Sequence, residues 1–313
     1  MFNLNLKRLG IAAGLSLSLV AAGCGSEDDS GSGDDTNSGG DSGEETAGVG
    51  EGVNYEITGI EAGAGVVAAS EDAVETYDNL EGWEVATSSS GAMASALGEA
   101  IENEEPIIVT GWSPHWKFAQ YDLKYLEDPE GVFGGEEQIK TMARQGLEED
   151  MPNAYAILDN FQWEASAMEN LMLEINEGTE PGEAAATWVE ENQDKVSSWT
   201  EGTEEVDGKE IELVYVNWDT EIASTNVVAE VLRNQGFDVT ITALDNGPMW
   251  NAVANGEADG MVAAWLPGTH GDLYEEHKDN LVDLGANLEG AKIGLVVPSY
   301  VEADSIEDLQ PAE

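Results

Sequence analysis

Short apolar runs alternate with stretches of helical periodicity along most of the chain after residue 54. Residues 107–112 and 211–218 are apolar runs of strand length. Between such runs, apolar side chains recur every three or four positions, as in Met93, Leu97 and Ile101. Strands that alternate with helices are typical of α/β proteins, so the pattern predicts an α/β fold.

The pattern occurs twice. Residues 83–114 and 237–267 each read as a strand, a Gly-x-Met turn that opens a helix, and a second strand that ends in Trp-x-Pro. The methionine precedes the tryptophan by 19 residues in the first copy and by 16 in the second. The agreement in order and spacing predicts two related lobes. Between the copies we expect residues 135–202 to be helical, and we expect residues 292–297 to form the closing strand.

The first 23 residues have the pattern of a signal peptide. Lys7 and Arg8 precede an apolar run, residues 11–22, and small residues lead up to Cys24. This pattern is similar to that of bacterial lipoproteins and predicts cleavage before Cys24, lipidation of its thiol and an extracytoplasmic location on the membrane. A membrane-spanning helix is the alternative, but about twelve apolar residues fall short of the ~20 that a bilayer requires.

The next segment, residues 24–53, is rich in Gly, Ser, Asp and Glu and almost free of apolar residues. Such a composition cannot bury enough surface to offset chain entropy. It predicts an acidic, disordered tether between the lipidated Cys24 and the folded body.

Charge sets limits on the partners. Asp and Glu number 64 against 11 Lys and Arg, which gives a net charge of −53. Phosphate backbones and anionic lipid surfaces would repel such a chain, so we expect no nucleic-acid partner. The apolar share of 41% and the nine tryptophans exclude wholesale disorder. The acidic excess indicates a halophilic protein, since concentrated salt screens carboxylate repulsion; an acidic protein of ordinary habitat is the alternative.

No motif indicates an enzyme. The chain has three histidines, His115, His270 and His277, and none pairs with another at metal-ligand spacing, so we expect no metal site and no cofactor. Gly-x-Ser-x-Gly and Walker motifs are absent, and Gly63 and Gly65 lack the third glycine of a dinucleotide-binding turn. Carboxylates are so numerous that a catalytic pair cannot be singled out.

Three tryptophans stand out by position. Trp112, Trp218 and Trp265 each fall at the carboxyl end of a predicted strand, next to a turn. Ligands of open α/β sheets bind at that edge. Aromatic faces attract cations and recognise quaternary ammonium groups, which have no N–H to donate. The three residues are therefore candidates for a quaternary ammonium cage, whereas packing in the core is the expectation for the other tryptophans, such as Trp163.

Five segments carry a family resemblance. They are residues 107–116 (IIVTGWSPHW), 215–226 (YVNWDTEIASTN), 247–250 (GPMW), 264–270 (AWLPGTH) and 293–300 (IGLVVPSY). In this order they closely resemble the glycine betaine substrate-binding lipoproteins of osmoprotective ABC importers. The resemblance extends over nearly all of the chain after Tyr55.

The resemblance implies a fold and a site. The fold would be a two-lobed periplasmic-binding-protein fold, type II-like with a permuted segment order, with lobe I at residues 54–121 plus 297–313 and lobe II at residues 122–296. Trp112, Trp218 and Trp265 would surround the trimethylammonium group. The backbone N–H groups of Gly65 and Val66, at a helix start, and the side chain of His270 would hold the carboxylate. His115, three residues after Trp112, competes with His270 for that role.

The resemblance implies a receptor and not an enzyme. It would bind glycine betaine, or a related betaine, outside the cytoplasm and deliver it to an ABC permease for osmoprotection. A lipid-anchored secreted hydrolase acting on carbohydrate is the alternative, because carbohydrate enzymes also use carboxylates and tryptophan platforms. A binding clamp explains the repeated Trp-x-Pro, and a hydrolase does not.

Overall fold

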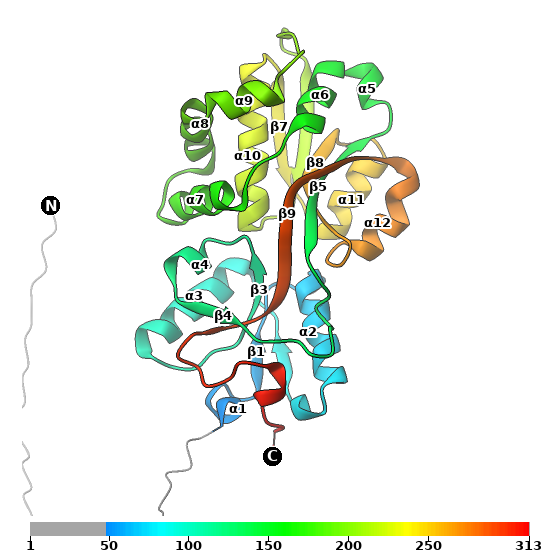
Figure 1. Cartoon of the computed structure of the whole chain (residues 1–313). Helices are drawn as coiled ribbons and strands as arrows, with labels where there is room; N and C mark the ends of the chain where they lie inside the picture. Colours follow the sequence, from blue (N-terminus) through cyan, green and yellow to red (C-terminus); the bar gives the residue numbers. More distant parts are fainter. Residues whose placement is uncertain (1–47, 313) are drawn as a thin grey trace, which may run out of the picture. The chain divides into compact units, whose positions relative to one another are not determined.

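The computed structural model describes residues 48–312, which form two lobes connected through one long strand (Figure 1). The predicted signal peptide, Cys24 and most of the predicted tether lie outside the described residues. Residues 48–53, at the end of the predicted tether range, include a short helix, and Val53 is buried in the body. Within the described part of the chain, no helix has both the length and the apolar character needed to cross a membrane.

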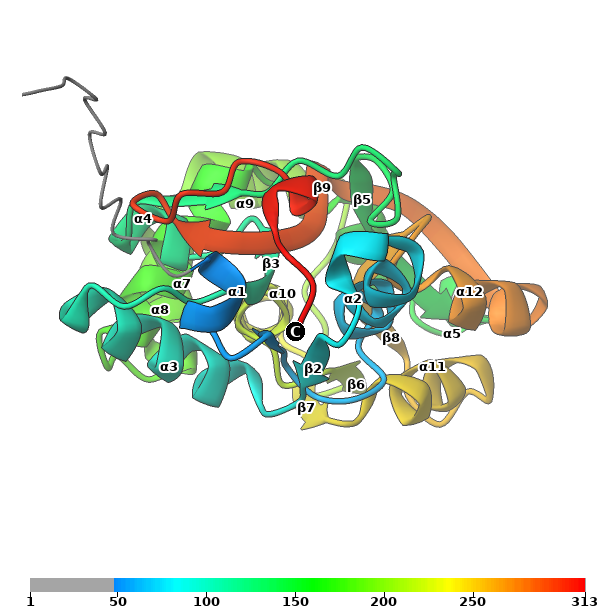
Figure 2. The same ribbon diagram turned by 90° about the horizontal axis from the view of Figure 1, so that it is seen from below.

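The first lobe consists of short strands and the helices that connect them. In chain order its elements are α1 (Val49–Gly52), β1 (Glu56–Thr58), α2 (Gly65–Thr76), β2 (Glu84–Ala86), α3 (Ser90–Asn103), β3 (Val109–Ser113), α4 (Lys117–Gln120) and β4 (Leu123–Tyr125). Seen from below, α2 and α3 flank β2 on opposite sides (Figure 2). The apolar stripe of α3 forms as expected, with Met93 and Leu97 fully buried.

The second lobe is larger. Its elements are β5 (Glu137–Arg144), α5 (Leu147–Asp150), α6 (Pro152–Asn160), α7 (Ala165–Asn176), α8 (Pro181–Glu191), α9 (Gln193–Trp199), β6 (Glu210–Tyr215), α10 (Asp219–Asn234), β7 (Asp238–Ala243), α11 (Asn246–Ala254), β8 (Gly260–Leu266), α12 (Gly271–His277) and β9 (Leu281–Pro298). Nearly the whole of α10 is buried between the sheet and the outer helices α7 and α8.

One strand, β9, belongs to both lobes. The strand order is β2-β1-β3-β9-β5-β8-β6-β7, with β4 also paired to β9. The first part of β9 is antiparallel to β5, from Leu281 opposite Arg144 to Ala291 opposite Glu137. The second part is antiparallel to β3, from Lys292 opposite Ser113 to Val296 opposite Val109. The change of partner between Ala291 and Lys292 connects the two lobes by continuous backbone.

The internal repeat is confirmed. The unit β2–α3–β3 in the first lobe corresponds to β7–α11–β8 in the second, and β1–α2 corresponds to β6–α10. In each lobe the order of the parallel strands is the same, and an antiparallel strand, β9 or β5, completes the sheet. Both Trp-x-Pro segments end in a cis peptide bond, at Pro114 and Pro267. The predicted two-lobed α/β fold is therefore confirmed.

Two element predictions were wrong. Residues 135–202 are not helical throughout, because residues 137–144 form β5, in which Glu137, Ile139 and residues 141–143 are buried. The closing strand is 18 residues long and not confined to residues 292–297. Both differences arise where the chain passes between lobes, since pairing with distant strands stabilises extended backbone there. The lobe boundaries at residues 121/122 and 296/297 stay a prediction.

The basic residues leave most of the acidic charge unneutralised. Within residues 48–312, ion pairs occupy many of the Lys and Arg side chains; examples are Arg144 with Asp150 and Asp259, and Lys140 with Asp283. With 64 acidic residues and only 11 basic ones in the chain, most carboxylates have no cation to pair with. We therefore expect the stability of the folded state to depend on screening by solvent ions.

We expect the melting temperature to rise steeply between 0.05 and 3 M KCl, because the Debye length shrinks from ~30 Å at ~0.01 M to ~3 Å at ~1 M salt. Thermal melts followed by circular dichroism measure this. Sucrose at matched osmolality serves as the control, since it is excluded from protein surfaces but screens no charge. A melting temperature that does not change with KCl would remove the halophilic interpretation.

Candidate functional site

The three candidate tryptophans converge on one cavity at the junction of the lobes. Trp112 lies on β3 in the first lobe, whereas Trp218 precedes α10 and Trp265 lies on β8 in the second. All three are nearly buried, with exposed fractions of 5%, 6% and 2%. Their meeting follows from the repeat, because β3 and β8 are equivalent strands whose carboxyl ends face the other lobe.

The cavity is small and apolar. Its lining comprises Ile60, Ala64, Gly65, Val66, Trp112, Trp218, Trp265, Thr269 and Ile293. The structure thus brings together five of the six predicted ligand-binding residues: the three tryptophans, Gly65 and Val66. No carboxylate is among the lining residues.

The amino end of α2 faces this cavity. Gly65 and Val66 are the first two residues of the helix, and within residues 48–312 neither N–H group has an acceptor. Free N–H groups at a helix start attract anions through hydrogen bonding and the helix dipole. Gly65 also lies against the second lobe, since a Cβ atom there would come within 2.5 Å of the Thr269 carbonyl oxygen. Only glycine permits this approach.

His270 lies next to the cage but does not line the cavity. Its Nδ1 accepts a hydrogen bond from the Trp265 backbone N–H at 3.0 Å, and its ring is stacked on Trp218 with 5.8 Å between centroids. Burial lowers the pKa of His270 to about 3, so the ring is neutral and carries its proton on Nε2. Nε2 is buried and has no partner among the described residues.

His115 has a different environment. Its Nδ1 accepts from the Lys117 backbone N–H at 3.1 Å, and its ring meets Trp112 edge-on. Its Nε2 faces Asp219 of the second lobe at 3.4 Å. Burial lowers the pKa of His115 to about 4 even though Asp219 opposes this. His115 is thus directed at Asp219 and not at the cavity.

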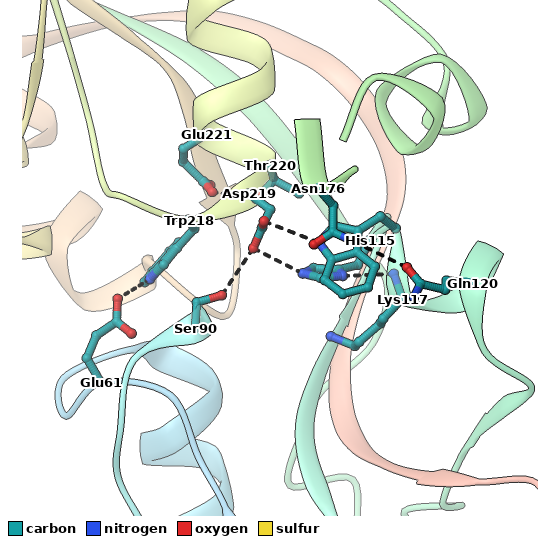
Figure 3. A network of polar contacts seen from close by, with 11 residues as sticks. Glu61, Ser90, His115, Lys117, Gln120, Asn176, Trp218, Asp219, Thr220 and Glu221 are labelled. Carbon is teal, nitrogen blue, oxygen red and sulfur yellow. Dashed lines mark hydrogen bonds and ion pairs between the residues drawn. The ribbon is translucent and has the colours of Figure 1, made fainter. Parts of the chain in front are cut away.

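Carboxylates orient two of the cage tryptophans. The indole N–H of Trp218 donates to Glu61 of the first lobe (Figure 3), and that of Trp265 donates to Glu221 at 2.8 Å. A third acid, Glu137 on β5, accepts from the N–H groups of Gly268 and Thr269 at 2.8 and 2.6 Å, which holds the turn after β8. These acids were missed from the sequence, because 64 acidic residues gave no basis for choosing among them.

Glu221 is fully buried behind Trp265. Burial raises its pKa to about 7, although hydrogen bonds from Thr220 and Trp265 oppose this; the nearby charge of Asp219 raises it further. A carboxyl group whose pKa is higher in the folded than in the unfolded state stabilises the fold below its ordinary pKa, and that stability is lost as the pH rises through the folded value. For Glu221 the window runs from 4.5 to about 7.

We expect the free energy of unfolding of Glu221→Gln, relative to that of the parent, to be about 3 kcal/mol higher at pH 8 than at pH 4.5. Glutamine accepts the Trp265 hydrogen bond but cannot ionise. Urea denaturation of both proteins at the two pH values, in the same high KCl, gives the difference. Titration of the other acids cancels in this comparison. An equal difference at both pH values would show that the folded state does not perturb Glu221.

The arrangement can hold a small zwitterion. Three indoles suit a methylated ammonium group, and the free N–H groups of Gly65 and Val66 suit a carboxylate. Among residues 48–312 there is no group of three or more His, Cys, Asp or Glu side chains that could hold a metal ion. The indoles and the N–H groups together suit a small organic zwitterion.

Comparisons with known proteins find relatives over most of the chain. A family model described as the substrate binding domain of ABC-type glycine betaine transport systems matches residues 40–191 and 209–313. The chain is 53% identical over 267 residues to the glycine betaine/carnitine transport binding protein GbuC of Listeria monocytogenes, which covers 85% of this chain and 89% of GbuC.

Two solved structures are also similar in part. Lactococcal OpuAC, in its closed-liganded conformation complexed with glycine betaine, is 47% identical over 47% of this chain and 58% of its own, with a TM-score of 0.43. An ABC-transporter choline binding protein in complex with choline is 28% identical over 49% of this chain and 55% of its own, with a TM-score of 0.43. Both matches span less than two thirds of the solved chain.

Proposed function

Because the chain belongs to the family of substrate-binding domains of ABC-type glycine betaine transport systems, we propose that it captures glycine betaine, or a close relative such as proline betaine, between its two lobes. One observation carries the proposal: Trp112, Trp218 and Trp265 line the same apolar cavity. An N-methylated ammonium needs no hydrogen-bond acceptor, so neutral indole faces can desolvate it without leaving a polar group unsatisfied.

The carboxylate of the ligand would bind at the amino end of α2. Its acceptors match the free N–H groups of Gly65 and Val66, and the positive end of the helix dipole adds attraction. Nε2 of both histidines is buried without a hydrogen-bond partner among the described residues. The contacts favour His270, because Nε2 of His115 faces Asp219 at 3.4 Å and that of His270 forms no such ion pair there. Rotation of the neutral His270 ring is restrained by Trp265 and Trp218.

Delivery to an ABC permease follows from the family, whose members serve transport and are not enzymes. Substrate-binding proteins of importers work outside the cytoplasm. We further propose that the chain is held there by a lipid on Cys24, after removal of residues 1–23; the sequence pattern at the amino terminus supports this anchor. The carbohydrate hydrolase gains no support from these relatives.

Tryptophan fluorescence titration tests the function. Glycine betaine should give a saturable change because the ligand sits among three indoles. Glycine, which lacks the methyl groups, should give none at the same concentration, and neither should a maltooligosaccharide. A response to the oligosaccharide without a response to betaine would reverse the choice between receptor and hydrolase.

A further inference from the structure

Asp219 is the first residue of α10. Each of its carboxylate oxygens accepts a hydrogen bond from the first lobe (Figure 3). Oδ1 accepts from the indole N–H of Trp116 at 3.2 Å. Oδ2 accepts from the Ser90 hydroxyl at 3.2 Å and faces His115 Nε2 at 3.4 Å. These three groups, two hydrogen-bond donors and one imidazole, come from two places in the first lobe, the start of α3 and the turn after β3.

These donors hold Asp219 in its charged form. Burial alone would raise its pKa, but the contacts from His115, Trp116 and Ser90 outweigh burial and hold the pKa at about 2. The start of α10 adds the favourable end of a helix dipole. Since every one of these side-chain donors belongs to the first lobe, the stabilisation exists only while the lobes are together.

Two further contacts join the lobes around the same cavity. Trp218, the neighbour of Asp219, donates its indole N–H to Glu61. Gly65 packs against the backbone of Thr269. Asp219 itself is absent from the cavity lining, so it cannot act by touching a solute there.

Asp219 is also linked electrostatically to the cage. The Lys117 ammonium is fully buried and lies 4.0 Å from the centre of the Trp112 ring. Its Nζ has no hydrogen-bond partner among the described residues. Burial lowers the pKa of Lys117 to about 7, and the charge of Asp219 opposes this. The charge of Asp219 therefore favours the protonated form of a lysine that packs on Trp112.

We propose that Asp219 is a positioning residue that clasps the two lobes and sets solute affinity through the fraction of molecules able to close. This inference rests on the proposed function in one respect: its effect on affinity can be measured only if the protein binds glycine betaine. A residue that acts on closure multiplies every dissociation constant by the same factor, because the apparent affinity scales with the population of the competent state. A residue that touches the solute instead changes the ranking of solutes.

The test compares Asp219→Asn with the parent, and with Asp194→Asn as a matched control. Asp194 also lies in the first turn of a helix of the second lobe, but it is exposed, and within residues 48–312 its side chain forms no hydrogen bond or ion pair with the first lobe. Isothermal titration at fixed high KCl gives the dissociation constants for glycine betaine and choline. We expect Asp219→Asn to weaken both by the same factor, about tenfold or more, since Ser90 and Trp116 lose a charged acceptor and His115 loses a nearby charge. Asp194→Asn should change neither.

Closure is measured without any solute by energy transfer between dyes on Glu102→Cys and Glu201→Cys, two exposed sites on different lobes, in the full chain with Cys24→Ser. The ligand-free closed fraction should fall in Asp219→Asn. This measurement separates the two proposals. If the parent binds no betaine, the proposed function fails, but the ligand-free closed fraction still shows whether Asp219 holds the lobes together.

A double-mutant cycle with Trp116→Phe, which removes one donor and keeps a ring, isolates the contact. The two substitutions should be less than additive in betaine affinity, since they remove the same hydrogen bond. The clasp is refuted if Asp219→Asn closes and binds like the parent, if betaine and choline are affected by different factors, or if the effects of the two substitutions simply add.

Discussion

Alanine in place of Trp265 is expected to weaken glycine betaine binding by about 5- to 30-fold, because loss of one indole face removes ~1 to 2 kcal/mol of cation attraction. Trp265 is the most deeply buried of the three cage residues, at 2% exposed, and β8 and Glu221 fix its orientation. Trp112→Ala and Trp218→Ala should have effects of similar size. Isothermal titration at one fixed high KCl concentration measures all three.

Phenylalanine variants at the same positions provide the control. A phenyl ring keeps an aromatic face and should retain part of the affinity, whereas alanine keeps none. If all three alanine variants bind betaine like the parent, the cage is not the binding site.

Trp163→Ala is expected to lower the free energy of unfolding by about 3 to 5 kcal/mol and to leave betaine affinity nearly unchanged. Trp163 is 5% exposed and packs against Phe161 and Trp188 in the second lobe, with ring centroids 5.6 and 5.8 Å away. Its removal leaves a cavity in an aromatic cluster whose ring contacts, within residues 48–312, include none of the three cage tryptophans. Urea denaturation gives the stability, and titration of the folded variant gives the affinity.

The cage tryptophans and Trp163 should respond differently to substitution. Cage variants should lose affinity more than stability, and Trp163→Ala should do the reverse. A loss of affinity in Trp163→Ala as large as in Trp265→Ala would mean that affinity follows overall destabilisation and not contact with the solute.

Local pattern was sufficient to predict the repeat and to select three tryptophans that line one cavity. Trp112 and Trp265 follow apolar runs of strand length, and a residue at a strand's carboxyl end lies at the sheet edge whatever the rest of the chain does. The pattern was insufficient where distant strands decide the conformation. Residues 137–144 form β5 because they pair with β8 and β9, which lie more than a hundred residues further along the chain.

The polar surroundings of the cage could not be predicted for a different reason. Asp219 and Glu221 lie two residues apart in one motif, yet one reaches across to the other lobe and the other lies behind Trp265. Their roles depend on which residues the opposite lobe presents, and an acid-rich sequence carries no local signal for that. His270 could be selected by the family motif, but only the structure shows that its Nε2 has no partner among the described residues.

A crystal structure with glycine betaine, grown at high KCl, tests the central claim most directly. We expect the methylated nitrogen to lie between Trp112, Trp218 and Trp265. The carboxylate should accept hydrogen bonds from the N–H groups of Gly65 and Val66 and from His270 Nε2. Betaine bound outside this cavity, or turned so that its carboxylate faces the indoles, would contradict it.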